Sequence, residues 1–343
     1  MANNGGPTQT HALLPGSPAI NAGNDCVLTM AGCATNDPPL ALTNDQRGFA
    51  RLAGTHVDIG AYELSLRRIP FDFDGDGKAD ISNFRPSSGT WHLLRSQLGY
   101  IGVAFGQSGD QITPADFDGD GKADVAVFRP SNSTWYRLNS SNGTFFFEQF
   151  GASGDVPIPQ DFDGDGKADL AVFRPSTGNW YWKNSSNGSV SGQQFGASGD
   201  KPTPGDFDGD GKADIGVFRP SSGAWYRLNS SNGQFFGIGF GSTEDKPTPA
   251  DYDGDGKADI SVYRPSTGVW YRLNSSDGSF AGVPFGTVGD KPAAADFDGD
   301  GKADIAVFRP SNGYWYLLNS TTGFSAVVFG VSEDTPTPNA FVY

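Results

Sequence analysis

Short apolar runs separated by turn-forming residues repeat along residues 67–343, and helical periodicity is not evident in them. The pattern in the repeat around residues 155–200 predicts four strands, at 158–162, 168–174 and 179–183 with a fourth ending at residue 196. Turns rich in Pro, Ser, Asn and Gly separate these strands. Because apolar residues occupy both faces, each unit must pack against a neighbour on either side.

Four strands in each unit of about 45 residues are typical of the blade of a β-propeller. The pattern therefore predicts an all-β fold, a β-propeller of six four-stranded blades over residues 67–343. Residues 1–66 lack the repeat and are predicted to form a separate region.

Six near-identical acidic loops lie between the first and second predicted strands of the repeats. They begin at Asp72, Asp116, Asp161, Asp206, Asp251 and Asp296 and are spaced by 44 residues once and 45 residues four times. Each reads D-x-D-x-D-G-x-x-D, so four carboxylates fall within nine residues. Their mutual repulsion makes a divalent cation the natural partner.

The ligand set of the loops favours calcium, which accepts six to eight oxygen ligands in irregular geometry. Positions 1, 3, 5 and 9 offer carboxylates, and the Lys at position 7 offers its backbone carbonyl with its side chain turned to water. No copy contains Cys or His, which disfavours zinc and copper, and magnesium demands stricter octahedral geometry. The predicted ligands of about six calcium ions are Asp72, Asp74, Asp76, Lys78, Asp80, Asp116, Asp118, Asp120, Lys122, Asp124, Asp161, Asp163, Asp165, Lys167, Asp169, Asp206, Asp208, Asp210, Lys212, Asp214, Asp251, Asp253, Asp255, Lys257, Asp259, Asp296, Asp298, Asp300, Lys302 and Asp304.

These loops are not EF-hands, because position 12 is Asn83 or Val127 instead of Glu and the flanking segments are predicted strands. A solvated acidic turn without metal is the alternative. Retention of every carboxylate in all six copies disfavours it.

The net charge of −15 is concentrated in the loops. Each loop carries −3, so the six account for −18 and the rest of the chain for +3; six calcium ions would leave about −3. Without a basic patch, nucleic acid is an unsuitable partner. No apolar stretch approaches the ~18 residues of a transmembrane helix, so membrane insertion is not expected.

Phe-Gly pairs recur near the end of each repeat, at Phe105-Gly106, Phe150-Gly151, Phe195-Gly196, Phe240-Gly241, Phe285-Gly286 and Phe329-Gly330. With the acidic loops, they make residues 67–343 resemble the FG-GAP/VCBS family, the calcium-loop propeller repeats of integrin α-subunit heads and many bacterial surface proteins. The resemblance implies an extracellular, calcium-binding propeller. Integrin heads have seven blades, whereas this chain offers six full repeats.

Ring closure has two predicted routes. The segment 335–343 begins like a seventh repeat and then stops without metal ligands. Either it pads one edge of six closed blades, or it seeds an incomplete seventh blade, which residues 57–63 could complete because they resemble a second strand.

Three segments of the first region, at 11–23, 45–51 and 57–63, are similar to the last turns of parallel β-helix domains in bacterial secreted proteins of the pectate-lyase-like class. This resemblance implies that Met1 begins a fragment, and that an upstream part with any signal peptide is missing. In an exported protein, Cys26 and Cys33 would form a local disulfide; two free thiols are the alternative.

Three further repeated features each allow a packing role and a binding role. The Trp that recurs in the third strand of every repeat is expected between blades, although six exposed Trp would suit a sugar-binding ring. The Arg of each Arg-Pro pair is expected to bond a repeated Asp such as Asp110, Asp155 or Asp200 and to fix adjacent blades; anion binding is the alternative. Asn-Ser-Ser at 139, 184, 229 and 274 matches glycosylation sequons but is interpreted as hairpin turns.

Catalysis is not expected, because His11, His56 and His92 do not recur with a nucleophile or a third partner. We expect a non-catalytic, calcium-stabilised module for binding or adhesion, located outside the cell or at its surface, whose partner is an unidentified glycan or surface protein. The alternative is a carbohydrate-binding, lectin-like module of a secreted polysaccharide-degrading enzyme. The sequence predicts no oligomeric state.

Overall fold

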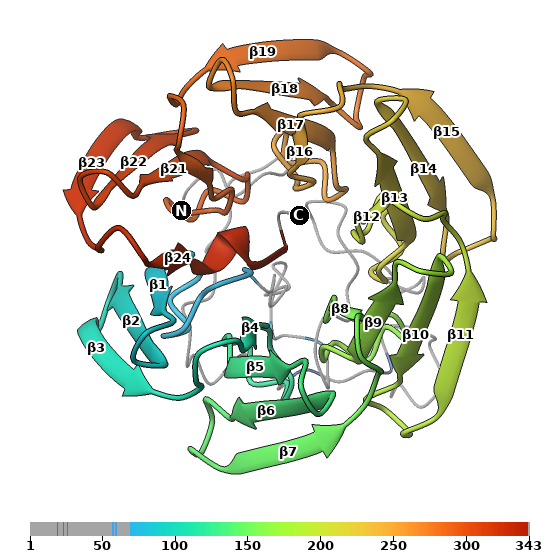
Figure 1. Cartoon of the computed structure of the whole chain (residues 1–343), viewed down its shortest axis with the longest axis horizontal. Coiled ribbons are helices and arrows are strands. Elements are labelled where there is room, and N and C mark those ends of the chain that lie inside the picture. The colour runs from blue at the N-terminus through green and yellow to red at the C-terminus, as the bar shows by residue number, and fades with distance from the viewer. Residues whose placement is uncertain are drawn as a thin grey trace. The chain divides into compact units, whose positions relative to one another are not determined.

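The computed structural model describes residues 69–341 and, near the N-terminus, Ala19, Gly23, Cys26, Val57 and Ile59. The chain divides into two compact units, Met1–Arg68 and Ile69–Tyr343. In the second unit, the described residues form six four-stranded antiparallel sheets arranged as blades around a ring (Figure 1). The predicted six-bladed β-propeller is thereby confirmed.

The innermost strand of each blade is two residues long. These strands are β4 (Gln111–Ile112), β8 (Val156–Pro157), β12 (Lys201–Pro202), β16 (Lys246–Pro247), β20 (Lys291–Pro292) and β24 (Thr335–Pro336). Five of the six end in proline, which has no N–H to continue the ladder and belongs at a sheet edge. The predicted strand at 158–162 is wrong, because the regular ladder covers only Val156–Pro157. Beyond it, Ile158 N donates to Ala171 O (2.8 Å) and Gln160 forms an isolated bridge with Asp169 before the chain enters the acidic loop.

The second and third strands form the apolar centre of each blade. The second strands are β1 (Ile81–Arg85), β5 (Val125–Arg129), β9 (Leu170–Arg174), β13 (Ile215–Arg219), β17 (Ile260–Arg264) and β21 (Ile305–Arg309). The third strands are β2 (Thr90–Arg95), β6 (Thr134–Leu138), β10 (Asn179–Lys183), β14 (Ala224–Leu228), β18 (Val269–Leu273) and β22 (Tyr314–Asn319). Four of the five residues of β5 are buried, because both faces of the strand pack against protein.

The outer strands are exposed and form the rim of the ring. They are β3 (Gly99–Ala104), β7 (Phe145–Gln149), β11 (Val190–Gln194), β15 (Phe235–Gly239), β19 (Phe280–Pro284) and β23 (Gly323–Val328). Within the described residues, no helix is long and apolar enough to span a membrane.

The tryptophan at the second position of every third strand packs between blades, as the sequence predicted. All six are at most 4% exposed: Trp91, Trp135, Trp180, Trp225, Trp270 and Trp315. Trp135 packs with Phe128 of its own blade and with Val172 of the next blade. This burial excludes a sugar-binding ring built from these six side chains.

The Phe-Gly pair completes the junction between blades. The indole N–H of Trp135 donates to the carbonyl of Phe150 (3.0 Å), and the same bond recurs in four other blades. Gly151 has φ of +109°, and a Cβ there would lie 3.2 Å from Val172 of the next blade. Glycine is therefore required by both its backbone conformation and the close approach of the neighbouring blade.

The C-terminal segment closes the ring by a route that the sequence did not predict. β24 pairs with β1 and supplies the innermost strand of the first blade, so the chain neither pads an edge nor begins a seventh blade (Figure 1). The 3₁₀ helix η1 (Thr337–Phe341) follows and packs against β1, β4, β20 and β24. Closure by a strand from the far end of the sequence protects the inner edge of β1.

An aspartate before each inner strand forms a bidentate ion pair with the arginine that ends the second strand of the same blade. In the third blade, Arg174 Nε and Nη2 donate to Asp155 at 2.7 and 2.8 Å. We call these the Arg–Asp pairs: Arg85–Asp334, Arg129–Asp110, Arg174–Asp155, Arg219–Asp200, Arg264–Asp245 and Arg309–Asp290. The predicted partners are confirmed, but each pair fixes the chain's entry into one blade; only Arg85–Asp334 joins the two ends of the repeat region.

In the first unit, two backbone hydrogen bonds join described residues, from Gly23 N to Val57 O (2.6 Å) and from Ile59 N to Ala19 O (2.9 Å). Cys26 is disulfide-bonded. The only other cysteine in the sequence, Cys33, lies outside the described residues, as does most of the three predicted β-helix segments.

Candidate metal centre

Five of the acidic loops follow the inner strand of their blade and the first loop precedes β1, and each is folded around its first aspartate. In the first loop, Asp72 Oδ1 accepts from Gly75 N at 2.6 Å and Asp72 Oδ2 accepts from Gly77 N at 2.9 Å. The glycines at positions 4 and 6 have positive φ, which lets the backbone curl around this carboxylate. Asp76 at position 5 accepts from Lys78 N and tightens the same turn.

The loops bring carboxylates from the predicted positions together. In at least five loops, three aspartates each offer one oxygen, and these oxygens lie within 4.8 Å of one another. The groups are Asp72–Asp74–Asp80, Asp116–Asp118–Asp124, Asp161–Asp163–Asp169, Asp206–Asp208–Asp210 and Asp251–Asp253–Asp255. Position 9 joins the group in the first three loops, and position 5 takes its place in the fourth and fifth.

The sixth loop repeats the backbone contacts of the others. Asp296 accepts from Gly299 N and Gly301 N, at 2.7 and 2.8 Å. Asp304 Oδ2 accepts from Phe297 N and Asp298 N, and Asp300 accepts from Lys302 N.

The hairpin turn between the third and outer strands contacts the loop, which the sequence reasoning missed. In the second blade, Ser140 N donates to Asp124 Oδ1 (2.7 Å) and Ser140 Oγ to Asp120 Oδ1 (2.9 Å). Ser141 Oγ donates to Asp118 Oδ2 at 2.6 Å. Asn139 closes the turn through backbone bonds, so the Asn-Ser-Ser segment is a hairpin turn as interpreted. The missed signal was that these serines recur with the same period as the loop aspartates.

Adjacent loops are also joined directly around the ring. The backbone N–H of Ala123 donates to the carbonyl of Asp72 in the preceding loop at 2.6 Å, and Ala79 donates to Asp296 at 2.7 Å to close the circle. All six loops repeat this contact, through Ala79, Ala123, Ala168, Ala213, Ala258 and Ala303. The six loops therefore form one continuous hydrogen-bonded circle.

The loop lysines are half-buried, and their aliphatic stems pack on the neighbouring loop, a contact that was not predicted. Lys122 is half-buried, and its stem lies over Gly75 of the preceding loop, where an added Cβ would come within 2.8 Å of Lys122 Cε. Lys167 lies over Gly119 in the same way. Covering a glycine-rich turn buries the aliphatic stem while the ammonium group lies near the neighbouring acidic loop.

Burial disfavours the charged form of the loop carboxylates. Burial raises the pKa of Asp80 to about 7, and this effect is larger than the lowering by hydrogen bonds from Ser96 N and Phe73 N. Repulsion from Asp74 raises the pKa further. Burial likewise raises the pKa values of Asp124, Asp169 and Asp304 to about 6. A nearby cation would reverse these shifts.

The donor set is compatible with a hard divalent cation. Asp74 Oδ1 and Asp298 Oδ1 are buried and accept no hydrogen bond from the described residues. Buried carboxylate oxygens without partners are costly, and coordination would satisfy them. Every side-chain ligand in the clusters is a carboxylate, which calcium prefers.

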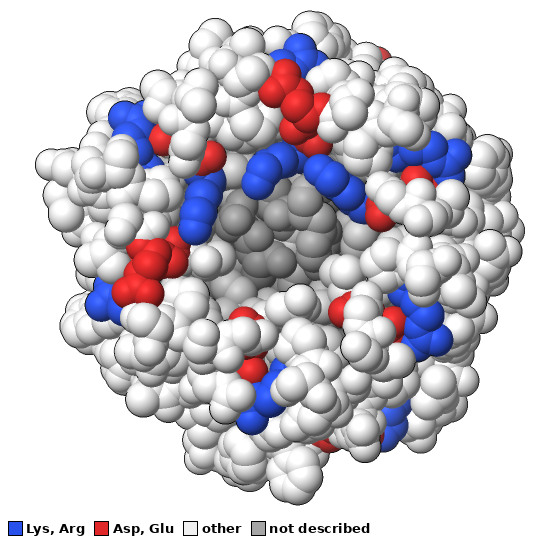
Figure 2. All heavy atoms as spheres, viewed as in Figure 1, with Lys and Arg blue, Asp and Glu red and all other residues white. Residues whose placement is uncertain are grey.

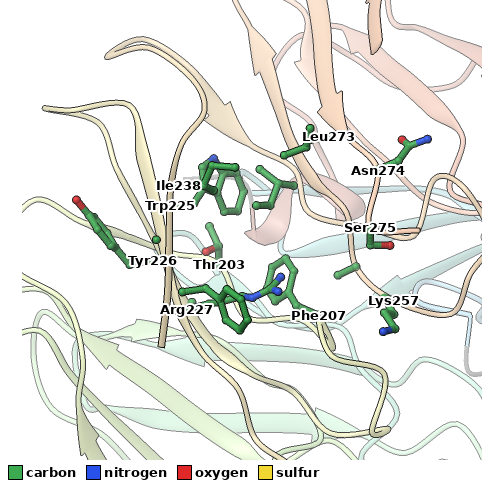
Figure 3. A pocket seen from close by; sticks show the side chains of 15 residues that line it. Thr203, Phe207, Trp225, Tyr226, Arg227, Ile238, Lys257, Leu273, Asn274 and Ser275 are labelled. Atoms are coloured by element: carbon green, nitrogen blue, oxygen red, sulfur yellow. The ribbon is translucent and has the colours of Figure 1, made fainter. Parts of the chain in front are cut away.

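A separate cavity of about 330 Å³ lies between the fourth and fifth blades (Figure 3). Trp225 and Ile238 line it from the fourth blade, and Asn274 from the fifth. Arg227 stacks over Phe207 at 5.3 Å, and burial lowers the pKa of its guanidinium. Arg227 Nε and Asn274 Oδ1 are buried without hydrogen-bond partners among the described residues.

A family model described as FG-GAP-like repeat matches residues 72–127, 161–217, 206–262 and 251–307, which together exceed half of the chain. A second model, FG-GAP repeat, matches residues 288–328. None of the curated proteins compared matches the chain.

Solved structures resemble the propeller at low sequence identity. A streptogramin B lyase has a TM-score of 0.50 at 8% identity, over 74% of this chain and 84% of that one. A catalytically inactive virginiamycin B lyase from Staphylococcus aureus, with quinupristin, has a TM-score of 0.50 at 8% identity, over 76% and 93%. A lectin from Agrocybe aegerita that recognises terminal N-acetylglucosamine has a TM-score of 0.49 at 16% identity, over 80% and 93%. At these identities, the likeness to the lyases concerns the fold alone.

Proposed function

Because the chain belongs to the FG-GAP-like repeat family, we propose that its propeller is a calcium-binding, non-catalytic module for binding or adhesion. Each of the six acidic loops holds one calcium ion. Aspartates at positions 1, 3, 5 and 9 and the backbone carbonyl of the lysine at position 7 are its protein ligands. Bound calcium neutralises the loops and stabilises the ring that they form.

The observation that carries this proposal is the convergence of three carboxylate oxygens within 4.8 Å in successive loops, together with the unpartnered buried Oδ1 of Asp74. Hydrogen bonds from loop glycines and hairpin serines hold these carboxylates in place. The preformed cluster reduces the ordering cost of binding, while its negative charge supplies the attraction.

The test is the metal content of the purified full chain, measured by inductively coupled plasma mass spectrometry after exchange into buffer with trace calcium. We expect about six calcium ions per chain, retained against a large excess of magnesium. Asp155→Asn serves as the control, because it removes a carboxylate charge that lies outside the loops, in an Arg–Asp pair. The calcium content of this variant should equal that of the parent. A parent chain that holds no calcium, or loses it to magnesium, overturns the proposal.

The same proposal places the protein outside the cell or at the cell surface, as a VCBS-type bacterial protein whose first region is the end of a pectate-lyase-like β-helix. Millimolar calcium outside cells suits loops of moderate affinity. The disulfide of Cys26 supports an oxidising location. Binding of labelled protein to cells or matrix proteins, lost on chelation and restored by calcium, tests the adhesion role.

Absence of a catalytic role is part of the proposal. Among the described histidines there is only His92, whose Nδ1 bonds Tyr100 Oη at 3.0 Å in a stacked pair. Burial lowers the pKa of His92, which supports a packed, neutral ring. His11 and His56 lie outside the described residues.

Carbohydrate binding is a second candidate, and the cavity between the fourth and fifth blades favours it. Phe236, which is 40% exposed, lines this cavity, and Arg227 stacks over its ring at 4.6 Å. With the unpartnered Arg227 Nε and Asn274 Oδ1, this exposed ring is a suitable environment for a sugar ring. A glycan array with the parent and Arg227→Met separates the candidates. Selective binding that Arg227→Met removes supports the lectin role, whereas no binding to any glycan leaves adhesion through protein partners.

A further inference from the structure

Three lysines occupy the same position on three consecutive inner strands. Lys201 begins β12, Lys246 begins β16 and Lys291 begins β20, and all three are half-buried. The other three inner strands begin with Gln111, Val156 and Thr335, which carry no charge. Repeats that are otherwise nearly identical therefore give one half of the inner ring a cationic arc. We call Lys201, Lys246 and Lys291 the lysine arc.

The lysine arc lies beside the centre of the ring. Figure 1 labels β12 and β16 around the centre of the ring, and Figure 2 shows Lys or Arg side chains at the inner edge of the ring on the face toward the viewer. Lys201 Nζ donates to the carbonyl of Asp245 (3.3 Å), and Lys291 Nζ donates to the carbonyl of Asp334 (2.8 Å). Each of these lysines therefore reaches across to the next blade.

No carboxylate in the described part of the chain forms an ion pair with the arc. Asp200, Asp245 and Asp290 directly precede the lysines, but each gives both carboxylate oxygens to an arginine. Lys246 has neither a hydrogen bond nor an ion pair to any described residue, in contrast to the two lysines beside it. Its ammonium group is the least satisfied of the three.

The arrangement carries an electrostatic cost. Burial lowers the pKa values of all three ammonium groups, and the charge of Lys246 lowers those of Lys201 and Lys291 further. Glutamine, valine and threonine fill the position in the other blades, so the fold does not require lysine there. Like charges gathered at such a cost are typical of a binding site rather than of a structural contact.

We propose that the lysine arc binds oxyanion groups, the carboxylates or sulfates of an acidic ligand, with Lys246 as the central contact. Ammonium groups are compact point charges that bond such oxygens from several directions. Three of them on neighbouring strands match a ligand that carries more than one anionic group. The site is formed by inner strands and does not depend on whether the acidic loops hold calcium.

Isothermal titration calorimetry of the full chain in calcium-containing buffer tests the proposal, with trigalacturonate as the carboxylate probe, a disulfated disaccharide as the sulfate probe and maltotriose as the neutral control. We expect the parent to bind at least one anionic probe and not maltotriose. Lys246→Gln should weaken that binding at least tenfold, and Lys246→Arg, which keeps the charge, should retain most of it. Lys183→Gln removes one positive charge from an exposed pair with Glu148 and should leave binding unchanged.

Thermal unfolding without ligand separates this role from a structural one. Lys246→Gln should unfold at the same temperature as the parent or higher, because it removes repulsion from a half-buried position. The proposal is overturned if the parent binds neither anionic probe, if Lys246→Gln binds as tightly as the parent, or if Lys246→Gln and Lys246→Arg both lose binding and stability together. A preference for one probe identifies the oxyanion.

Discussion

Two kinds of aspartate recur in every blade, and they differ in how their negative charge is balanced. In the Arg–Asp pairs, both carboxylate oxygens meet one guanidinium, as Asp155 meets Arg174 at 2.7 and 2.8 Å. In the acidic loops, Asp169 accepts backbone N–H groups from Phe162 and Ser185, and burial raises its pKa to about 6. The first set is neutral by itself, whereas the second gathers negative charge that a bound cation or protonation would neutralise.

The Arg–Asp pairs should therefore stabilise the fold under all conditions, whereas the contribution of the loops should depend on calcium. The Arg–Asp pairs fix the chain at the entrance to each blade with no external component. The loops, in contrast, form a continuous hydrogen-bonded circle whose charge opposes its own closure. We therefore expect calcium to act on stability through the loops alone.

Removal of calcium should have the largest effect. At ~1 mM calcium and a dissociation constant of about 10 µM, each site would add ~2–3 kcal/mol by mass action, although coupled sites need not add. Chelation should lower the Tm of the parent markedly, and calcium should restore it more fully than magnesium. Differential scanning calorimetry measures this; an unchanged melting curve after exhaustive chelation would falsify the calcium assignment.

Trp225→Ala should come next, because it removes packing between the fourth and fifth blades. Trp225 is 4% exposed and donates to the carbonyl of Phe240 at 2.9 Å. Truncation of a buried Trp costs about 3–5 kcal/mol. Chemical denaturation with and without calcium should show a similar loss in both conditions. A loss below about 1 kcal/mol would contradict burial between blades.

Breaking one Arg–Asp pair should have a smaller effect that is independent of calcium. Asp155→Asn leaves Arg174 without its carboxylate, but the arginine is 29% exposed and can recruit water. We expect a loss of about 2–3 kcal/mol, below the cost of breaking a fully buried pair. The comparison fails if this loss changes with calcium concentration, since the two sets of aspartates would then be coupled.

Features that depend on one repeat could be predicted from the sequence, whereas contacts between distant segments could not. Strand content, the acidic loops and the burial of the Trp residues could be predicted, because each depends on the pattern within one repeat. The pairing of β24 with β1 could not be predicted, because it joins Thr335 and Phe84, which come from opposite ends of the repeat region. Periodicity describes what each repeat contains and does not specify which segment closes the circle.

The candidate site shows the same limit. The aspartates of each loop could be read from the D-x-D-x-D-G-x-x-D pattern. The position of Lys122 over Gly75 could not, because it involves the preceding blade. Nor could the contact of Ser140 with Asp120, since a separation of 20 residues acquires meaning only once the hairpin is folded.

Loss of one loop aspartate should affect a single calcium site, in contrast to loss of an aspartate from an Arg–Asp pair. Asp165 accepts from Lys167 N and Ser185 Oγ, at 2.8 Å each. Asp165→Ala should reduce the calcium content by one ion per chain and lower stability by at most the ~2–3 kcal/mol of one site, in calcium only. Native mass spectrometry counts the ions. An unchanged count would show that position 5 is not a ligand.

The smallest expected effect is the pH dependence of the chelated protein. The folded-state pKa of Asp80 is about 7 and that of Asp169 about 6, both raised from 3.8 mainly by burial. A carboxyl group with a raised folded-state pKa contributes stability that is full below the unfolded pKa and is lost as pH rises through the folded pKa. The Tm of the chelated protein should therefore rise by a few degrees between pH 7.5 and pH 6. The calcium-loaded protein should not gain stability over this range, because protons compete with the metal for the same oxygens.

Equal pH profiles with and without calcium would mean that the loop carboxylates do not differ in pKa between the folded and unfolded protein. Asp80→Asn, which cannot titrate, should flatten the profile of the chelated protein, whereas Asp155→Asn should leave it intact.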